Sequence, residues 1–123
     1  MKTSGRKELA VTGETAAEEF LRKKKYRILA RNYRCPLGEI DLVAEQNKVI
    51  VFVEVKTRTS RAFGEPEEAV TQTKQKKLGQ LAEYYLKGQN SDDKDVRFDV
   101  ISILVNSQDK SLEFSHFQNA FEF

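Results

Sequence analysis

The stretch from Gly38 to Arg58 reads GEIDLVAEQNKVIVFVEVKTR and decides the fold of this 123-residue chain. Two runs rich in valine and isoleucine flank a short polar segment at residues 46–48, which is typical of an antiparallel β-hairpin. Each run contains charge: Asp41 lies in the first, and Glu54 and Lys56 lie in the second. A buried charge is costly unless it is paired with another charge or with a metal ion. These residues are therefore either a structural ion-pair network or an active site.

The register of the hairpin decides whether the three charges meet. Side chains alternate across a strand, so Glu54 and Lys56 share one face. A two-residue turn at Asn47-Lys48 places Asp41 opposite Glu54, and a turn at Gln46-Asn47 makes the two carboxylates diagonal neighbours. A three-residue turn would separate them unless a bulge restored the face. Two-residue turns thus predict that the two carboxylates lie at one spot, about 5 Å apart at Cβ when they are directly opposite.

Two carboxylates at this distance repel each other unless a cation lies between them. Lys56 supplies one positive charge, and hard oxygen ligands select Mg²⁺ or Mn²⁺ over Zn²⁺. Such a metal polarises a phosphate and lowers the pKa of an attacking water, while a lysine orients that water or stabilises charge on the phosphoryl oxygens. The alternative, a buried salt bridge of Lys56 with Glu54 or Asp41, rarely adds net stability. We therefore interpret the three residues as a candidate site for phosphodiester hydrolysis.

The remaining sequence predicts one α/β domain. We expect a flexible segment at residues 1–11, a helix with its N-cap at Thr12, strands at 26–34, 39–45 and 49–57, a helix from Pro66 to Lys87, and strands at 97–105 and 112–117. The segment 71–73 is a candidate break in the second helix. The order α-β-β-β-α-β-β predicts a mixed sheet with a central hairpin and flanking helices, and the domain occupies residues 12–123.

Composition favours a soluble globular protein, with 39% hydrophobic and 33% charged residues. No apolar run is long enough to span a membrane, and the N-terminus lacks the apolar region of a signal peptide. Cys35 is the only cysteine, so no intramolecular disulfide can form and we expect a cytoplasmic protein. The net charge is only +2, but the segment from Arg22 to Arg34 has seven basic residues and no acidic one. This segment is either a phosphate-binding rim or an ordinary solvated surface.

Candidate residues also lie outside the hairpin. Glu14 and Glu18 are one helical turn apart and share a face, so one of them can reach a metal at the hairpin, whereas we expect simple solvent exposure for Glu18. Asp99 lies in an apolar strand, where we expect it to hydrogen-bond a neighbouring loop rather than to anchor the site. His116 is expected to be a half-buried strand residue.

Basic residues near the hairpin are candidates for binding nucleic acid. Arg58 and Arg61 lie in the segment that follows the charged strand, with Phe63 beside them, and such a set can grip a DNA backbone or stack on a base. Lys74 and Gln75 lie near the start of the second helix. They contact either a phosphate near the metal or only solvent, and the sequence does not favour one over the other.

Several short motifs resemble those of a bacterial protein family. They are Gly13-Glu14-x-x-Ala17, Asn32-Tyr33-Arg34, Gly38-Glu39-Ile40-Asp41-Leu42, Val51-Phe52-Val53-Glu54-Val55-Lys56-x-Arg58, Val70-Thr71, Lys74-Gln75 and Arg97-Phe98-Asp99-Val100. Together they resemble the YraN-like family, a relative of archaeal Holliday-junction resolvases. Asp41…Glu54-Val55-Lys56 also resembles the PD-(D/E)xK nuclease motif, with Ile40 in place of its proline.

The resemblance implies a restriction-endonuclease-like core and a role for each site residue. Asp41, Glu54 and the Val55 carbonyl would be metal ligands, Lys56 would be the catalytic lysine, and Glu14 would complete the site. The expected function is a Mg²⁺- or Mn²⁺-dependent endonuclease that acts on DNA, in particular on branched or structured DNA. The alternatives are a non-catalytic nucleic-acid-binding module with the same fold, and action on RNA. A resolvase makes two symmetric cuts, so that role would predict a homodimer.

Overall fold

The computed structural model describes residues 5–59, 71–91 and 93–121, with side chains from residue 13 onward in the first helix. Seven elements follow one another in the order predicted from the sequence. They are α1 (Gly5–Lys23), β1 (Arg27–Cys35), β2 (Gly38–Gln46), β3 (Val49–Arg58), α2 (Gln72–Gly88), β4 (Asp95–Val105) and β5 (Leu112–Phe117). The result is a small α+β domain.

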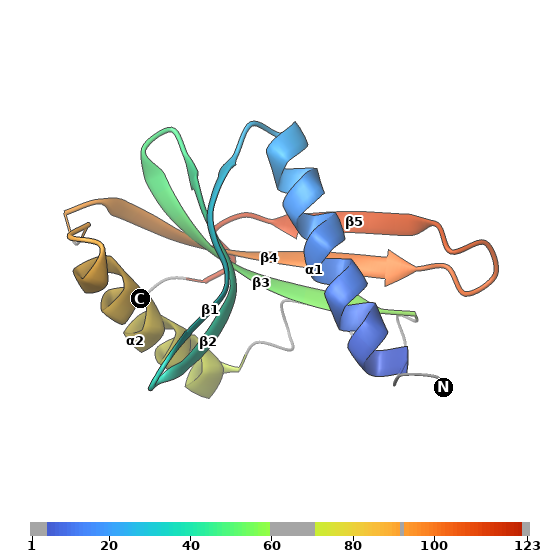
Figure 1. Ribbon diagram of the computed structural model, residues 1–123, viewed down its shortest axis with the longest axis horizontal. Coiled ribbons are helices and arrows are strands. Elements are labelled where there is room, and N and C mark those ends of the chain that lie inside the picture. The colour runs from blue at the N-terminus through green and yellow to red at the C-terminus, as the bar shows by residue number, and fades with distance from the viewer. Residues whose placement is uncertain (1–4, 60–70, 92, 122–123) are drawn as a thin grey trace.

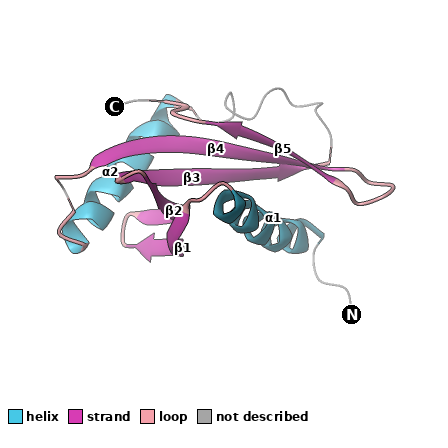
Figure 2. Ribbon diagram, turned by 90° about the horizontal axis from the view of Figure 1, so that it is seen from above, coloured by secondary structure: helices cyan, strands magenta, loops and turns pink. Residues whose placement is uncertain are grey.

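The five strands form one mixed sheet in the order β1-β2-β3-β4-β5. Only β3 and β4 are parallel, and the chain between them contains α2, as a parallel connection requires. The predicted mixed sheet with a central hairpin is therefore confirmed. The β1–β2 hairpin curls away from the other strands and lies between the two helices (Figure 1 and Figure 2).

The turn between β2 and β3 has two residues, as predicted. Gln46 pairs with Val49 and Leu42 pairs with Val53, so Asn47 and Lys48 alone make the turn. Both have positive φ, 51° for Asn47 and 68° for Lys48, which is the backbone of a type I′ turn. This turn matches the right-handed twist of the strands and fixes the register of the charged hairpin.

Each face of the sheet packs against one helix and has its own hydrophobic core. The first core joins α2 to the sheet through Leu78, Leu81, Tyr85, Val43, Phe52 and Phe98. The second joins α1 to the opposite face through Ala17, Leu21, Leu42, Val51, Val53 and Ile101. Because side chains alternate along β3, residues 52 and 54 face α2 while residues 51 and 53 face α1. The charged residues of β3 therefore lie on the α2 face.

The structure changes some predicted helix boundaries. The first helix begins at Gly5, so the predicted N-cap at Thr12 is wrong and Thr12 lies within α1. The second helix begins at Gln72, because Thr71 is its N-cap and its side chain accepts a hydrogen bond from the Lys74 amide. The first part of the helix predicted from Pro66 to Lys87, residues 66–70, falls outside the described residues. The flexibility of residues 1–11 stays a prediction.

Candidate active site

The candidate site forms where β2 separates from β3. The ladder between these strands ends at the Leu42–Val53 pair, and Asp41 is the β2 residue immediately before Leu42. Its carboxylate oxygen Oδ2 accepts a hydrogen bond of 2.8 Å from the Val55 amide. The Asp41 side chain thus accepts a hydrogen bond from the Val55 N–H group, which has lost its partner strand because β2 separates from β3 at this point.

Glu54 lies next to Val55 and is held by two lysines. Lys74 Nζ is 2.7 Å from Glu54 Oε1, and Lys56 Nζ is 3.4 Å from the same oxygen. Only 12% of the Glu54 side chain is exposed, against 28% for Lys56 and 37% for Lys74. The structure therefore brings Asp41, Glu54 and Lys56 together, and it adds Lys74 from α2.

The crowding of these groups changes their protonation. Burial and the nearby charge of Glu54 raise the pKa of Asp41 from 3.8 to about 7, although the Val55 amide favours the ionised form. Burial and the adjacent Lys74 ammonium lower the pKa of Lys56. Burial also disfavours a charged Lys74, but its hydrogen bond to Glu54 raises the pKa of Lys74 overall. Lys56 is therefore the lysine that gives up its proton more readily.

The glutamates of α1 have different environments. Gly13 lies so close to β3 that a Cβ atom there would be 2.1 Å from Thr57 Oγ1, so only glycine lets the helix approach at this point. This approach holds Glu14 near the site, where its negative charge contributes to the raised pKa of Asp41. Glu18 is bound to Arg22 at 2.8 Å and to Arg31 at 3.3 Å, and its side chain is 12% exposed. The expected solvent exposure of Glu18 is therefore wrong.

The carboxylates fit a hard divalent cation in their chemistry, but they do not form a complete cage. Among the described residues, Oδ1 of Asp41 and Oε2 of Glu54 have no hydrogen-bond partner, and carboxylate oxygens are the ligands that Mg²⁺ prefers. No three Asp, Glu, His or Cys side chains come together as a metal-holding group in that part of the chain. Glu14, which would be the third carboxylate, acts on Asp41 through its charge rather than as part of such a group.

Three of the four predicted nucleic-acid-binding residues lie in the described part of the chain, on β3 and α2. Arg58 ends β3, and Lys74 is directed at Glu54, with Gln75 next to it in α2. Arg61 falls outside the described residues. Part of the basic segment is paired with carboxylates: Arg22 and Arg31 share Glu18, Arg27 binds Glu45 and Arg34 binds Glu39.

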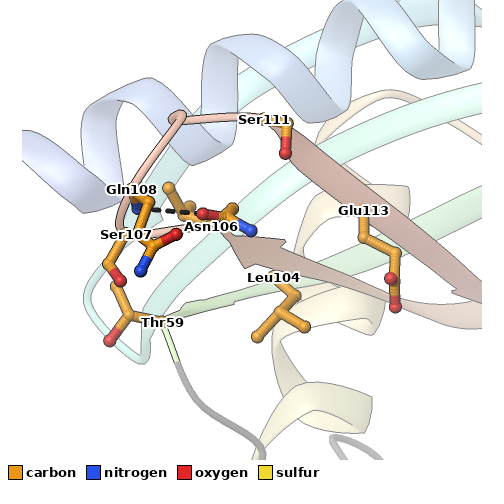
Figure 3. Close-up of a pocket in the computed structure, with 8 residues that line it drawn as sticks. Thr59, Leu104, Asn106, Ser107, Gln108, Ser111 and Glu113 are labelled. Atoms are coloured by element: carbon orange, nitrogen blue, oxygen red, sulfur yellow. Dashed lines mark hydrogen bonds between the residues drawn. The ribbon is translucent and has the colours of Figure 1, made fainter.

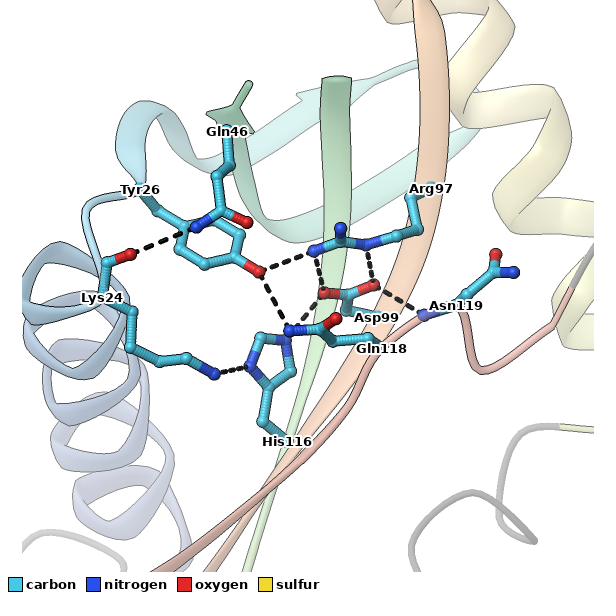
Figure 4. Close-up of polar contacts among 8 residues, drawn as sticks. All are labelled: Lys24, Tyr26, Gln46, Arg97, Asp99, His116, Gln118 and Asn119. Atoms are coloured by element: carbon cyan, nitrogen blue, oxygen red, sulfur yellow. Dashed lines mark hydrogen bonds and ion pairs between the residues drawn. The ribbon is translucent and has the colours of Figure 1, made fainter. Parts of the chain in front are cut away.

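A second polar cluster centres on Asp99, whose side chain is fully buried (Figure 4). Arg97 donates two hydrogen bonds of 2.8 and 2.9 Å to its carboxylate, and the Asn119 amide donates one of 2.9 Å. His116 Nε2 lies 2.7 Å from Asp99 Oδ2, and Lys24 Nζ lies 2.7 Å from His116 Nδ1. Burial alone would raise the pKa of Asp99, but these hydrogen bonds lower it below its ordinary value.

This cluster was predicted only in part. The expected hydrogen bond of Asp99 to a neighbouring loop is confirmed by Asn119, which follows β5. His116 lies in a strand as expected, but its side chain is only 4% exposed rather than half-buried. The contacts of Asp99 with Arg97 and His116 were missed. The first had a signal in the sequence, because residues two apart on a strand share a face. The contact with His116 depends on the pairing of β4 with β5, and the sequence contains no signal for it.

A separate hollow of about 440 Å³ lies between the end of β3 and the β4–β5 turn (Figure 3). Its lining includes Thr59, Asn106, Ser107 and Glu113. The Asn106 side chain accepts a hydrogen bond of 2.8 Å from the Gln108 amide and thereby shapes the turn. The predicted site residues that the structure describes do not line this hollow.

Comparison with known families agrees with the motifs in the hairpin. Residues 13–103 match the model of the uncharacterised protein family UPF0102. The chain belongs to this family. UPF0102 proteins with similar sequences include those of Caldicellulosiruptor saccharolyticus, 47% identical over 94% of this chain and 98% of its own length, and Syntrophomonas wolfei, 49% identical over the same shares. The UPF0102 protein of Geobacter metallireducens is 48% identical over 94% of this chain and 93% of its own length.

UPF0102 membership confirms the resemblance to the YraN-like family. The matched range begins at Gly13, the glycine that lets α1 approach β3, and it contains every predicted site residue from Glu14 to Gln75. His116 and Asn119 of the Asp99 cluster lie beyond it. The UPF0102 name states no activity. No helix in the described part of the chain is long and apolar enough to cross a membrane.

Proposed function

We propose that this protein is a Mg²⁺- or Mn²⁺-dependent endonuclease that hydrolyses phosphodiester bonds in DNA. The observation that carries the proposal is the meeting of Asp41 and Glu54 with Lys56 at the point where β2 leaves β3. Carboxylates this close, one with a pKa raised to about 7, favour a cation between them. The order of elements and the parallel β3–β4 pair support a restriction-endonuclease-like core for this function.

Each residue of the site would have its own role in this reaction. Asp41 and Glu54 would hold the metal together with the Val55 carbonyl, and the bound metal would polarise the phosphate and acidify a water molecule. Lys56 lies beside Glu54 and has a lowered pKa, so it is suited to accept a proton from that water or to orient it. Glu14 would add negative charge from α1. Arg58, Arg61, Lys74 and Gln75 would contact the DNA backbone.

The test is a cleavage assay with matched variants. The protein is incubated with supercoiled, single-stranded, flap and four-way-junction DNA in Mg²⁺ or Mn²⁺, and Glu54→Gln and Lys56→Met are compared with the wild type. We expect both variants to lose about 100-fold or more in rate, because each removes a group at the reacting centre. The exposed Glu83→Gln and Lys76→Met make the same chemical changes elsewhere and should keep the wild-type rate. Wild-type activity no higher than that of Glu54→Gln on every substrate would refute catalysis.

A second function, nucleic-acid binding without catalysis, has two observations in its favour. Glu54 is already neutralised by two lysines, and the described residues hold no ready group of three metal ligands. Isothermal titration calorimetry separates the two functions. Binding of Mn²⁺ that is lost in Asp41→Asn and Glu54→Gln supports the nuclease, and its absence supports the binding module. Competition between DNA and RNA, and sizing in solution for the homodimer that a resolvase needs, define the substrate further.

A further inference from the structure

In the described part of the chain Glu54 has two lysine partners, where one would balance its charge. Lys56 and Glu54 are two residues apart in β3, so the alternation of the strand places them on the same face. Lys74 has no such reason to be there. It comes from α2, twenty residues away in the chain, and makes the shorter of the two contacts, 2.7 Å against 3.4 Å.

The position of Lys74 is also unfavourable for its own helix. Thr71 is the N-cap of α2, so Lys74 lies in the first turn, and that turn contains no acidic residue. The N-terminal end of a helix carries partial positive charge, which disfavours a lysine there. The contact with Glu54, rather than the stability of the helix, therefore explains why a lysine stands at this position.

The charges of the site nearly balance before any metal binds. With the carboxylates ionised, Asp41, Glu54 and the nearby Glu14 carry three negative charges, and Lys56 and Lys74 carry two positive ones. A divalent cation would add two positive charges beside a glutamate that is only 12% exposed. Such an excess is costly at low exposure unless a cation leaves or an anion arrives. Lys74 can leave more easily than Lys56, because its side chain is more exposed and belongs to a different element.

We propose that Lys74 is the resident counter-ion of Glu54, that a divalent metal ion displaces it, and that its ammonium group then binds a phosphate of the nucleic acid. This inference rests on the proposed function. It adds that metal binding and nucleic-acid binding are energetically coupled. The metal frees the lysine that the phosphodiester needs, and the phosphodiester supplies the negative charge that the metal needs. Each ligand therefore raises the affinity for the other by the same factor.

The test measures Mn²⁺ affinity, by calorimetry and by the electron paramagnetic resonance signal of free Mn²⁺, in wild type, Lys74→Met and Lys76→Met. Lys76 is exposed on the same helix, so its variant removes the same charge without touching Glu54. Without nucleic acid, Lys74→Met should bind Mn²⁺ about tenfold or more tightly than wild type, and Lys76→Met should stay within about twofold. A phosphorothioate oligonucleotide, which resists cleavage, should tighten Mn²⁺ binding about tenfold in wild type and much less in Lys74→Met.

The outcomes separate this inference from the proposed function. Equal Mn²⁺ affinity in wild type and Lys74→Met overturns the inference, and if that binding still requires Asp41 and Glu54 the proposed metal site stands. Mn²⁺ binding that requires neither carboxylate overturns both. If circular dichroism shows that Lys74→Met is not folded, Lys74→Gln replaces it, since glutamine can still donate a hydrogen bond to Glu54 but carries no charge.

Discussion

Asp41 has surroundings that favour its protonated form. It faces Glu54 and is influenced by Glu14, and among the described residues its hydrogen bond comes from the Val55 amide. An aspartate with a pKa of about 7 is half ionised near neutral pH, so small changes in its environment change its charge. A cation bound between Asp41 and Glu54 would restore the ionised form. The residue is therefore a sensitive reporter of whether the site binds metal.

The raised pKa of Asp41 predicts how stability depends on pH. The folded state binds more protons than the unfolded state between about pH 4 and 7, so the free energy of unfolding should fall as pH rises through this window. Asp41→Asn lacks this titrating group, so its free energy of unfolding should fall less than that of wild type between about pH 4 and 7. The difference between the two falls should be at most about 4 kcal/mol. Urea unfolding at several pH values measures this. The exposed Asp93→Asn is the control, and parallel curves for wild type and Asp41→Asn would contradict the prediction.

At the scale of the element, the β2–β3 turn sets the register on which the site depends. Lys48 has a φ of 68°, a conformation that glycine adopts without strain and lysine does not. We expect Lys48→Gly to raise the free energy of unfolding by about 0.5 to 1 kcal/mol, because relief of backbone strain outweighs the greater freedom of the unfolded chain. Lys48→Ala removes the same side chain but keeps the strain, so it should bring no gain. A gain for both variants in urea unfolding would mean that the lysine side chain, not its backbone, is unfavourable.

The packing of α1 on β3 depends on Gly13. In the interior of an ordinary helix, glycine to alanine stabilises by up to about 1 kcal/mol. Here the new Cβ would meet Thr57 Oγ1 at 2.1 Å, so we expect Gly13→Ala to lower the free energy of unfolding by about 1 to 3 kcal/mol. Thr57→Ala should recover much of this loss in the double variant. The control is Gly88→Ala, where an added Cβ has no neighbour within 4 Å, and a stabilised Gly13→Ala would disprove the close approach.

The hairpin was predictable because its information is local. The alternation of apolar residues and a two-residue turn place Asp41 near Glu54 without any knowledge of the rest of the fold. Lys74 was named as a candidate, but its contact with Glu54 depends on how α2 crosses the sheet. The pairing of Arg31 with Glu18 likewise depends on where α1 lies against β1. Contacts between distant elements follow from three-dimensional packing, so periodicity along the chain does not reveal them.

At the scale of the whole molecule, Asp99 joins parts of the fold that are far apart in the chain. Its carboxylate binds Arg97 of β4, His116 of β5 and the Asn119 backbone, and His116 continues the chain of contacts to Lys24, just after α1 (Figure 4). The Lys24 ammonium can only donate, so His116 Nδ1 accepts and Nε2 carries the proton toward Asp99. A neutral histidine thus links the two charged groups and ties the end of α1 to the sheet.

The Asp99 cluster should therefore stabilise the molecule as a unit. We expect Asp99→Asn to lower the free energy of unfolding by about 3 to 5 kcal/mol near neutral pH, because it leaves the half-buried Arg97 without its charge partner. The lowered pKa of Asp99 stabilises the fold above the ordinary aspartate pKa, and this contribution disappears as pH falls through the folded value. The deficit of Asp99→Asn relative to wild type should therefore shrink in acid. Hydrogen exchange should show faster opening in α1, β4 and β5 together, with Asp93→Asn as control, and a change confined to β5 would show that the cluster acts only locally.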